Sequence, residues 1–362
     1  MRHPAVAPIL KRVFLSAALL GAGWTLTAQD AKPAAPKDLP VAQKQSALLS
    51  GFSKAVAYSG FRHGQHPDRG AGAVNPTDAQ LLEDLTILAR GKQFGLIRLY
   101  DSQENSQAAL RLIRKHKLPI KVMLGMWLDA EVHNPDCAWL TQPIPPATLA
   151  ANKLKNQEEV ARGIRLAKEY ADLVVAVNVG NECQVTWNDH LVPEESLIAY
   201  IRAVKKAIKQ PVSTADNYVW WTQHGAKVAK EVDFIAIHTY PAWENKTAKE
   251  ALEYSIKNIQ ELRNALPDSR LVISEAGWAS SAWEFGAQAN ELDQENYING
   301  LLKWTKAMNI TFFIFEAFDE DWKGDPGNAG GAEKHWGLFT IDRKPKLIMQ
   351  KDYADLLPAK VK

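Results

Sequence analysis

Val177 to Glu182 reads VNVGNE, a short apolar and β-branched run that ends on a glutamate. Leu271 to Trp278 reads LVISEAGW, and its apolar part likewise ends on a glutamate, Glu275. A short apolar run of this kind is typical of a buried β-strand. The two stretches therefore predict two strands, each presenting a carboxylate where the backbone leaves the interior.

Runs of the same character recur from about Ser53 onward, and helical patterns separate them. One helix start is explicit, because residues 77–80, TDAQ, form a capping box that leucines follow at helical spacing. Eight strands alternating with about eight helices indicate a parallel sheet, and the count of eight favours a closed (β/α)8 barrel. An open doubly wound sheet would need a glycine-rich phosphate loop, which Gly70-Ala71-Gly72 does not match. We therefore predict an α/β fold, a (β/α)8 TIM barrel in a single domain.

The element boundaries follow from the same periodicities. The predicted strands are Ala55–Tyr58, Leu96–Tyr100, Ile120–Met126, Leu173–Val179, Val212–Ala215, Phe234–His238, Leu271–Ser274 and Phe312–Phe315. The predicted helices, besides the one that starts after Thr77, are Ser106–His116, Gln157–Tyr170, Glu194–Ile208, Ala248–Ala265 and Asn296–Met308, with weaker patterns at Gly225–Glu231 and Leu347–Leu356.

The composition is that of an ordinary globular protein. The chain has 362 residues, of which 46% are hydrophobic and 23% charged, and its net charge is +2. This balance gives no electrostatic reason to expect a nucleic acid or an acidic polymer as a partner. We expect a monomer.

The N-terminus has the plan of a secretory signal peptide. Arg2, Lys11 and Arg12 precede the apolar stretch Val13–Gly23, and small residues up to Ala28 offer a cleavage site. The apolar part is short for a membrane span, although an uncleaved signal anchor is the alternative. We predict a signal peptide at 1–28, a disordered linker at 29–48 and the (β/α)8 catalytic domain at 49–358. The location would be secreted or periplasmic, with no stable membrane partner beyond the leader.

The two glutamates lie on strands that face each other across the predicted barrel. Glu182 ends the fourth strand and Glu275 the seventh, so their side chains can converge on one bond. Glycoside hydrolysis requires such a pair, one acid and one nucleophile or base, and a separation of about 5–5.5 Å selects retention of configuration. The alternative is that each charged residue belongs to a structural ion pair.

Tryptophan is concentrated after the predicted strands. Of twelve tryptophans, ten follow a strand's C-terminal end, and in a barrel those loops gather on the face where active sites lie. Flat amphipathic faces at one mouth suit stacking on sugar rings. The alternative is that half or more of them pack loops against the rim, which we expect of Trp139 and Trp336 especially. The ten are Trp127, Trp139, Trp187, Trp220, Trp221, Trp243, Trp278, Trp283, Trp322 and Trp336.

VGNE at 179–182 and SEAGW at 274–278 resemble the two catalytic signatures of glycoside hydrolase family 17, the β-1,3-glucanase family of the retaining (β/α)8 clan. The resemblance covers about Gly51 to Met349 and is closer to the microbial branch, given Trp220-Trp221 and Glu316. Further matching stretches are IRLYD at 97–101, Tyr240-Pro241, FDEDWK at 318–323, WGLF at 336–339, and Tyr58 on the first strand.

The resemblance implies that Glu182 is the acid/base and Glu275 the nucleophile. The acid must hold a proton near neutral pH, which calls for an apolar or anionic neighbourhood, whereas the nucleophile must stay ionised and needs donors such as Tyr240. Asn181 is expected to bond the hydroxyl next to the reacting carbon. The expected substrate-binding residues are Tyr58, Arg98, Tyr100, Asn181, Asn217, Trp221, Tyr240, Trp278, Glu320 and Lys323.

Other polar residues give weaker indications. We expect His238 to bond a neighbouring polar group rather than to carry catalysis, and no histidine spacing suggests a metal site or another cofactor. Cys137 and Cys183 either pair or remain free thiols. The loop Asp129–Pro146 carries four prolines and could wall part of the cleft.

Three functions remain open from the sequence. The first is retaining hydrolysis of a laminarin-type β-1,3-glucan through a covalent glucosyl-enzyme, as in a glucan β-1,3-glucosidase. The second is transglycosylation by the same chemistry, with a sugar as acceptor instead of water. The third, from another class, is a non-catalytic glucan-binding protein, against which both glutamates argue. Endo or exo action is not decided.

Overall fold

The structure is a computed structural model that describes residues 38–68 and 70–357. The predicted signal peptide at 1–28, the first part of the predicted linker at 29–37 and residue 358 lie outside the described residues. Within the described part of the chain, no helix is both long enough and apolar enough to cross a membrane.

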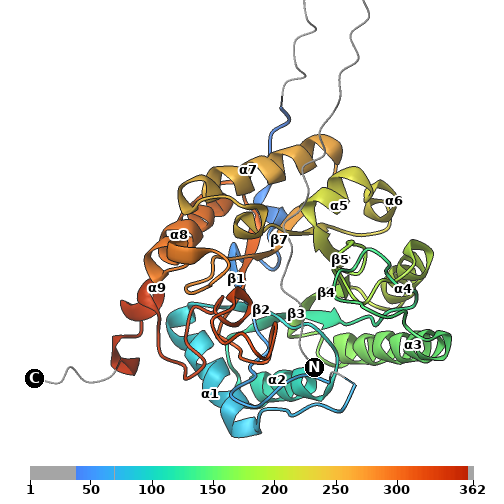
Figure 1. Ribbon diagram of the computed structural model, residues 1–362, viewed down its shortest axis with the longest axis horizontal. Coiled ribbons are helices and arrows are strands. Elements are labelled where there is room, and N and C mark those ends of the chain that lie inside the picture. The colour runs from blue at the N-terminus through green and yellow to red at the C-terminus, as the bar shows by residue number, and fades with distance from the viewer. Residues whose placement is uncertain (1–37, 69, 358–362) are drawn as a thin grey trace, which may run out of the picture. The chain divides into compact units, whose positions relative to one another are not determined.

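Eight parallel strands of the described chain close into a ring in chain order, and β8 pairs back onto β1 (Figure 1). Val56 of β1 shows the closure, because it pairs with Ile97 of β2 and with Ile314 of β8. The strands read as near-continuous apolar runs because both faces of a parallel sheet are covered. The predicted (β/α)8 barrel is confirmed. The strands are β1 (Lys54–Ala57), β2 (Leu96–Arg98), β3 (Lys121–Met126), β4 (Val174–Asn181), β5 (Val212–Asn217), β6 (Ile235–His238), β7 (Leu271–Ala276) and β8 (Thr311–Ile314).

Helices surround the strands, as Figure 1 shows. The α-helices are α1 (Asp78–Ala89), α2 (Glu104–His116), α3 (Pro146–Glu169), α4 (Glu194–Ala207), α5 (Tyr218–Gln223), α6 (Ala226–Ala229), α7 (Ala248–Ala265), α8 (Glu291–Ala307) and α9 (Leu347–Gln350). Short 3-10 helices are η1 (Gln45–Ala47), η2 (Arg90–Lys92), η3 (Pro241–Glu244), η4 (Gly286–Gln288), η5 (Ala332–Lys334) and η6 (Ala354–Leu356).

The capping box predicted at the start of α1 is present. Thr77 Oγ1 accepts from Gln80 N at 3.3 Å, and Gln80 Oε1 accepts from Thr77 N at 2.9 Å. Such a cap contributes about 1 kcal/mol to helix stability. The local sequence therefore fixes where the first helix begins after β1.

Two helices differ from the prediction. α3 begins at Pro146, well before the predicted Gln157, because its first turns are mostly exposed and so carry little hydrophobic periodicity. Proline at the first helical position favours that start. Between β5 and β6 the chain forms two short helices, α5 and α6, and only the second was predicted, since α5 reads YVWWTQ and is too short and too uniformly apolar to show a period.

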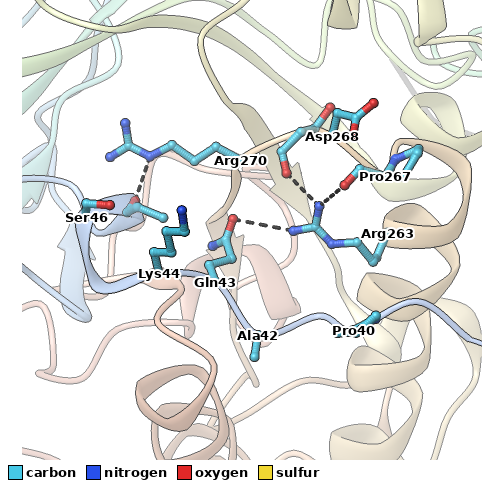
Figure 2. Close-up of a pocket in the computed structure, with 11 residues that line it drawn as sticks. Pro40, Ala42, Gln43, Lys44, Ser46, Arg263, Pro267, Asp268 and Arg270 are labelled. Atoms are coloured by element: carbon cyan, nitrogen blue, oxygen red, sulfur yellow. Dashed lines mark hydrogen bonds between the residues drawn. The ribbon is translucent and has the colours of Figure 1, made fainter.

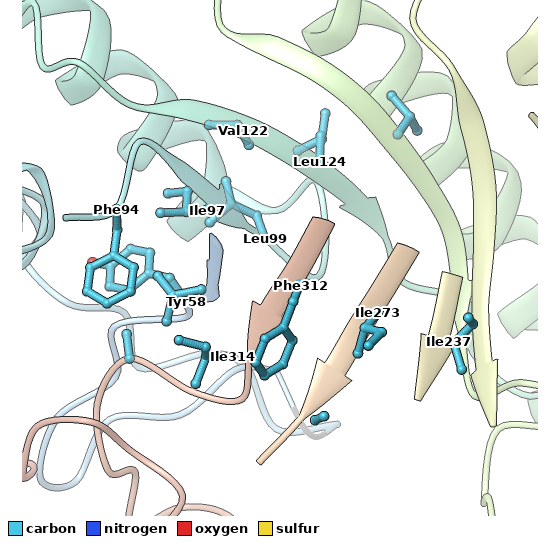
Figure 3. Close-up of a cluster of buried hydrophobic side chains, with 14 of the residues drawn as sticks. Tyr58, Phe94, Ile97, Leu99, Val122, Leu124, Ile237, Ile273, Phe312 and Ile314 are labelled. Atoms are coloured by element: carbon cyan, nitrogen blue, oxygen red, sulfur yellow. The ribbon is translucent and has the colours of Figure 1, made fainter. Parts of the chain in front are cut away.

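The core has two layers because alternate residues of a strand point to opposite faces. The outer layer packs strand residues against the helices, and Figure 3 shows part of it with Ile97, Ile237, Ile273 and Phe312. The inner layer fills the barrel with residues from every strand. Its buried members are Leu49, Ala55, Leu96, Met123, Ala176, Ala215, Phe234, Ala236, Val272 and Phe313.

Residues 38–48 correct the predicted linker. They pack against the N-terminal ends of the strands, with Val41 and Leu48 buried. The Gln43 amide accepts from Leu271 N at 2.7 Å and donates to Leu271 O at 2.9 Å, which extends the ladder beneath β7. Figure 2 shows Gln43 beside Arg263 in a shallow pocket at this end of the barrel. Composition predicted a spacer here, but its few apolar side chains anchor it, so the folded unit begins no later than residue 38.

Candidate active site

Two carboxylates from opposite sides of the barrel meet at one imidazole. His238, the last residue of β6, places Nδ1 2.9 Å from Glu182 Oε1 and Nε2 3.4 Å from Glu275 Oε1. Glu182 follows β4 directly and Glu275 lies in β7. A single ring and its two contacts therefore separate carboxylates that lie 93 residues apart in the sequence. The expectation that His238 bonds a neighbouring polar group is confirmed twice over.

The backbone at the end of β4 is bent to aim Glu182 at the mouth. Glu182 has φ +46°, a left-handed conformation that is uncommon for a residue with a Cβ. Gly180 has φ +79°, and a Cβ there would lie 2.8 Å from Cys183 Sγ. The pairing of β4 with β5 shifts register between Asn178 and Asn181. Strain of this kind is often stored at functional sites.

Glu275 is buried among donors. Arg98 Nη1 lies 2.6 Å from Oε1, Tyr100 donates to Oε1 at 3.0 Å, and Tyr240 donates to Oε2 at 2.6 Å. Burial alone would raise the pKa of Glu275, but the electrostatic effects of His238 and Arg98 and the two phenol hydrogen bonds outweigh it and leave the pKa below its usual value. Glu275 is thus held as a carboxylate.

Arg98 connects the nucleophile candidate to Asn181. The guanidinium is buried, and besides Glu275 it donates to the Ser274 carbonyl at 3.0 Å and to Asn181 Oδ1. Because Arg98 occupies the amide oxygen, the group that Asn181 can offer to a ligand is its NH2. Tyr100, whose ring lies against the guanidinium, has its pKa raised by burial and remains a neutral donor.

Glu182 lies in a different environment. Its side chain is 22% exposed, against 7% for Glu275, and Trp187 Nε1 donates to its Oε2 at 3.4 Å. Asp216, at the end of β5, is fully buried, and burial followed by the nearby charge of Glu182 raises the pKa of Asp216 well above its usual value. Glu182 therefore has a buried carboxyl group, that of Asp216, as a close neighbour.

The loop after β8 supplies a second charged cluster. Lys323 pairs with Glu316 and, at 3.2 Å, with Glu320. Burial would lower the pKa of Lys323, but the two glutamates reverse the direction and raise it. Glu320 also accepts from Ser59 Oγ at 2.6 Å and from Phe61 N at 3.1 Å. Glu320 therefore braces this loop against the loop after β1, and Lys323 is largely covered.

Glu333 was missed by the sequence reasoning. It lies in the same loop, and its pKa is raised to about 7 by burial first and then by the charges of Glu182, Glu275 and Glu284, against the opposing charge of Lys323. A third carboxyl group thus lies close enough to both candidate catalytic groups for their charges to raise its pKa. The only sequence signal was its position three residues before the WGLF stretch at 336–339.

Two tryptophans predicted to bind substrate are buried instead. Trp221 and Trp278 are fully covered, and their indole N–H groups donate to the carbonyls of Ala236 at 2.9 Å and Gln288 at 2.8 Å. Position after a strand places a residue near the mouth, but large aromatic side chains there can turn inward and fill the rim. Neither indole is available to a sugar.

The side chains of Tyr58 and Asn217 are also buried. Tyr58 is 2% exposed, and its hydroxyl donates to Asp84 Oδ2 at 3.3 Å on the helix side of β1. Asn217 caps α5, where its Oδ1 accepts from Val219 N at 2.8 Å. Both side chains are used by the fold, so the prediction that they contact substrate is wrong for this arrangement.

Of the ten tryptophans that follow a strand, four are exposed, four are buried, and Trp127 and Trp322 are intermediate. Trp336 packs as expected against Tyr240, Phe285 and Phe315, and is fully buried. Trp139 was expected to pack but is 60% exposed, which corrects that prediction. The exposed indoles are those of Trp139, Trp187, Trp243 and Trp283, and the buried ones those of Trp220, Trp221, Trp278 and Trp336.

The remaining predictions concern the two cysteines, a metal site and the loop Asp129–Pro146. Cys137 and Cys183 are both buried free thiols, so the disulfide alternative is excluded. Over residues 38–68 and 70–357, no group of three or more His, Cys, Asp or Glu side chains is arranged to hold a metal ion. The loop Asp129–Pro146 contacts the loop after Glu182 through Asn134, whose amide donates to the Asn188 carbonyl at 2.8 Å.

The family model of the BtgE/BtgC glycoside hydrolase domain matches residues 55–337. A glucan 1,3-beta-glucosidase from Arthroderma benhamiae is 27% identical over 267 residues, covering 69% of this chain and 78% of the relative. A probable glucan endo-1,3-beta-glucosidase btgC from Aspergillus flavus is 23% identical and covers 75% of this chain. This chain spans only 40% of that Aspergillus protein and 48% of a Saccharomyces cerevisiae glucan 1,3-beta-glucosidase.

Solved structures show the same fold. An endo-laminarinase from Formosa Hel1_33_131 superposes with a TM-score of 0.72 at 26% identity, covering 86% of this chain and 89% of its own. A glycoside hydrolase family 17 β-1,3-glucanosyltransferase from Rhizomucor miehei superposes with a TM-score of 0.62 at 24% identity, covering 83% and 97%.

Proposed function

The chain belongs to the BtgE/BtgC glycoside hydrolase domain family, and from that membership we propose that it cleaves β-1,3-glucan with retention of configuration. The two relatives named for glucan 1,3-beta-glucosidase activity and the laminarinase neighbour support the linkage. The contrast between the two glutamates supports the mechanism, because one is buried among donors and the other is more open and lies beside a buried aspartate.

Glu275 attacks the anomeric carbon while Glu182 gives its proton to the departing glycosidic oxygen, which leaves a covalent glucosyl-enzyme and a Glu182 carboxylate. Glu182 then removes a proton from water, whose oxygen bonds to the anomeric carbon and releases Glu275. Carboxylates in unlike environments can divide acid and nucleophile roles in this way. The Asn181 NH2 group, oriented by Arg98, bonds the hydroxyl beside the reacting carbon.

His238 keeps the two carboxylates in register during both steps. Its Nδ1 lies 2.9 Å from Glu182 Oε1, and its Nε2 lies 3.4 Å from Glu275 Oε1 and 3.2 Å from Arg98 Nη1, so one ring contacts both sides of the site. The convergence of Glu182 and Glu275 on His238 is the observation that carries the proposal.

Transfer to a sugar acceptor is the second candidate. Trp187 and Trp139, both exposed, lie on the two loops next to Glu182, and Glu182 faces the bond through which the leaving group departs. A sugar held on that side competes with water for the glucosyl-enzyme. Chemistry up to the covalent intermediate is common to both candidates.

We further propose that the chain is exported as a monomer, with a cleaved signal peptide at 1–28. The basic residues at the start, the short apolar stretch and the small residues up to Ala28 support this cleavage. Mass spectrometry of the protein from the culture medium or the periplasm tests both the cleavage site and the location.

Product profiling over time on linear β-1,3-, β-1,4- and β-1,6-glucans tests the function. We expect turnover of the β-1,3-glucan alone, products longer than the substrate if transfer occurs, and loss of turnover in Glu275→Gln. Glu182→Gln should slow substrates with poor leaving groups far more than activated aryl glucosides. Binding without turnover in the unaltered protein would instead support the glucan-binding alternative.

A further inference from the structure

We propose that Trp187 positions the acid/base and forms the platform on which the leaving or accepting sugar stacks. The proposal rests on the function proposed above and assigns a residue that controls the choice between water and sugar. Trp187 lies five residues after Glu182, in the loop that connects β4 to α4. Its indole combines a contact to the reacting carboxylate with an open aromatic face.

The first observation is the contact itself. Trp187 Nε1 donates to Glu182 Oε2 at 3.4 Å while His238 Nδ1 lies 2.9 Å from Oε1, so each carboxylate oxygen has its own partner. The plane of the Glu182 carboxyl group is therefore set from two sides. Hydrogen bonds of catalytic groups are often long without substrate and shorten when the site is occupied.

The second observation is that the exposed indole is carried on a rigid loop. The Asn188 amide donates to the Glu182 carbonyl, and the Asn134 amide donates to the carbonyls of Val185 at 3.3 Å, Thr186 at 3.2 Å and Asn188 at 2.8 Å. Asn134 and Asn188 are each 3% exposed. Buried amides thus fix the backbone on both sides of Trp187.

The third observation is the exposure of the ring. Trp187 is 42% exposed although large apolar side chains gain free energy by burial. An exposed aromatic face on a fixed backbone loses little entropy when a flat ligand stacks on it. A pyranose ring has the apolar faces and polar edges that suit an indole with a nearby carboxylate.

A neighbouring indole extends the platform. Trp139 is 60% exposed and lies two residues after Cys137, whose Sγ donates to the Trp187 carbonyl at 3.6 Å. The loop before α3 and the loop after β4 therefore present two exposed indoles from adjoining backbone. Trp139 is thus a second exposed indole on a loop that contacts the Trp187 backbone.

The chemistry requires a sugar on this side. In the first step the glycosidic oxygen takes the proton from Glu182, so the leaving sugar lies against Glu182 and not behind Glu275. In transfer, the acceptor hydroxyl gives its proton to the Glu182 carboxylate and its oxygen bonds to the anomeric carbon, by the reverse path. A residue that holds Glu182 and stacks on that sugar therefore acts both when the bond is cleaved and when the acceptor sugar is joined.

Trp187→Phe and Trp187→Ala separate the two roles, because phenylalanine keeps a flat face but lacks the N–H. Trp304→Phe, on the outer helix α8, is the control for the same substitution away from the mouth. We measure kcat and KM on a β-1,3-oligosaccharide and on an aryl β-glucoside with a good leaving group. The ratio of transfer to hydrolysis is followed as laminaribiose is added, and thermal unfolding checks that each variant is folded.

We expect Trp187→Phe to lower kcat on the oligosaccharide about tenfold, the loss of one hydrogen bond to a charged group, and to leave the activated glucoside within about twofold. Trp187→Ala should in addition raise the laminaribiose concentration needed for half-maximal transfer about tenfold, since a stacked ring is lost. Phenylalanine should restore that concentration to the value for the unaltered protein.

The assignment is overturned if both Trp187 variants match Trp304→Phe, if Trp187→Phe slows both substrates equally, or if Trp187→Ala leaves the response to laminaribiose unchanged. Absence of transfer products at saturating laminaribiose would remove the acceptor role. Inactivity of the unaltered protein on every β-glucan would refute the proposed function itself, whereas an active protein with indifferent Trp187 variants refutes only this inference.

Discussion

Tyr240→Phe should shift the acidic side of the pH profile towards neutrality. The Tyr240 hydroxyl donates to Glu275 Oε2 at 2.6 Å, and this hydrogen bond helps to hold the pKa of Glu275 below its usual value, after the effects of His238 and Arg98. Phenylalanine keeps the ring but removes the donor. The lost hydrogen bond stabilises the carboxylate form of Glu275 more than its protonated form, so the pKa of Glu275 rises.

The size of the shift follows from the geometry. A hydrogen bond to a charged group contributes about 1.5–3 kcal/mol, and one pKa unit corresponds to about 1.4 kcal/mol. The remaining donors can partly compensate, so we expect an increase of about one unit. Tyr100→Phe removes a longer bond, 3.0 Å against 2.6 Å, and should give a smaller increase.

The assay is the pH dependence of kcat/KM on an activated aryl β-glucoside, whose acidic limb reports protonation of the free nucleophile. Tyr254→Phe is a matched control, because Tyr254 donates to the Glu244 carboxylate at the same distance, 2.6 Å, outside the site. The reasoning fails if Tyr240→Phe moves the acidic limb by less than about 0.2 unit, or if Tyr100→Phe moves it further.

Stability should follow the same linkage. A carboxyl group whose folded pKa is lowered contributes stability above its unfolded pKa, and this contribution disappears as the pH falls through the folded pKa. Glu275 therefore stabilises the unaltered protein above about pH 4.5 and loses that contribution below it. Tyr240→Phe reduces the contribution of Glu275, so the variant should lose more stability at pH 7 than at pH 3.

Three further predictions concern groups other than the nucleophile. The pKa of Glu333 is raised to about 7, so ionisation of this carboxyl group destabilises the fold as the pH rises from about 4.5 to 7. Glu333→Gln should therefore be more stable than the unaltered protein at pH 8 but not at pH 4. An equal effect at both pH values would contradict the burial of this carboxyl group. Gln43→Ala loses the two hydrogen bonds to Leu271, so the free energy of unfolding should fall by about 2 kcal/mol with kcat unchanged; a neutral result would mean that residues 38–48 are not part of the cooperative unit. Gly180→Ala would place a Cβ 2.8 Å from Cys183 Sγ at φ +79°, so activity should fall by at least tenfold, and a soluble variant with full activity would show that the bend before Glu182 is not required.

The sequence predicted the strands well because their signal is local. Each strand of the barrel is a short apolar run, and the predicted and observed bounds differ by only a few residues. The carboxylates could be placed for the same reason, since a strand's C-terminal end fixes the face on which a residue lies. Glu182 and Glu275 needed only this rule and the order of the strands.

The direction of side chains at the mouth of the barrel could not be predicted from the sequence in the same way. Trp221 and Trp278 follow strands just as Trp187 does, yet the first two turn inward to backbone carbonyls and the third remains open. The difference depends on which neighbours from other loops fill the rim, and those contacts are distant in sequence. Glu333 was missed because only the folded chain brings it towards Glu182 and Glu275.

Residues 38–48 illustrate another limit. The predicted spacer included them because of the Ala, Pro and Lys content of residues 31–41, whereas Gln43 makes hydrogen bonds to Leu271, 228 residues away, and to Asn309. Composition reports the propensity of a segment on its own. It carries no information about the start of β7, where the backbone N–H and C=O of Leu271 bond to the Gln43 side chain.

The most direct measurement identifies which glutamate bonds to the sugar. Glu275→Ala and Glu182→Ala are each given an activated β-glucoside and sodium azide, and NMR determines the configuration of the glucosyl azide formed. Azide that enters the space left by Glu275 should give the α-azide, whereas azide that opens a glucosyl-enzyme in Glu182→Ala should give the β-azide. The exchanged pattern, or no glucosyl azide from either variant, would contradict the assignment of the two carboxylates.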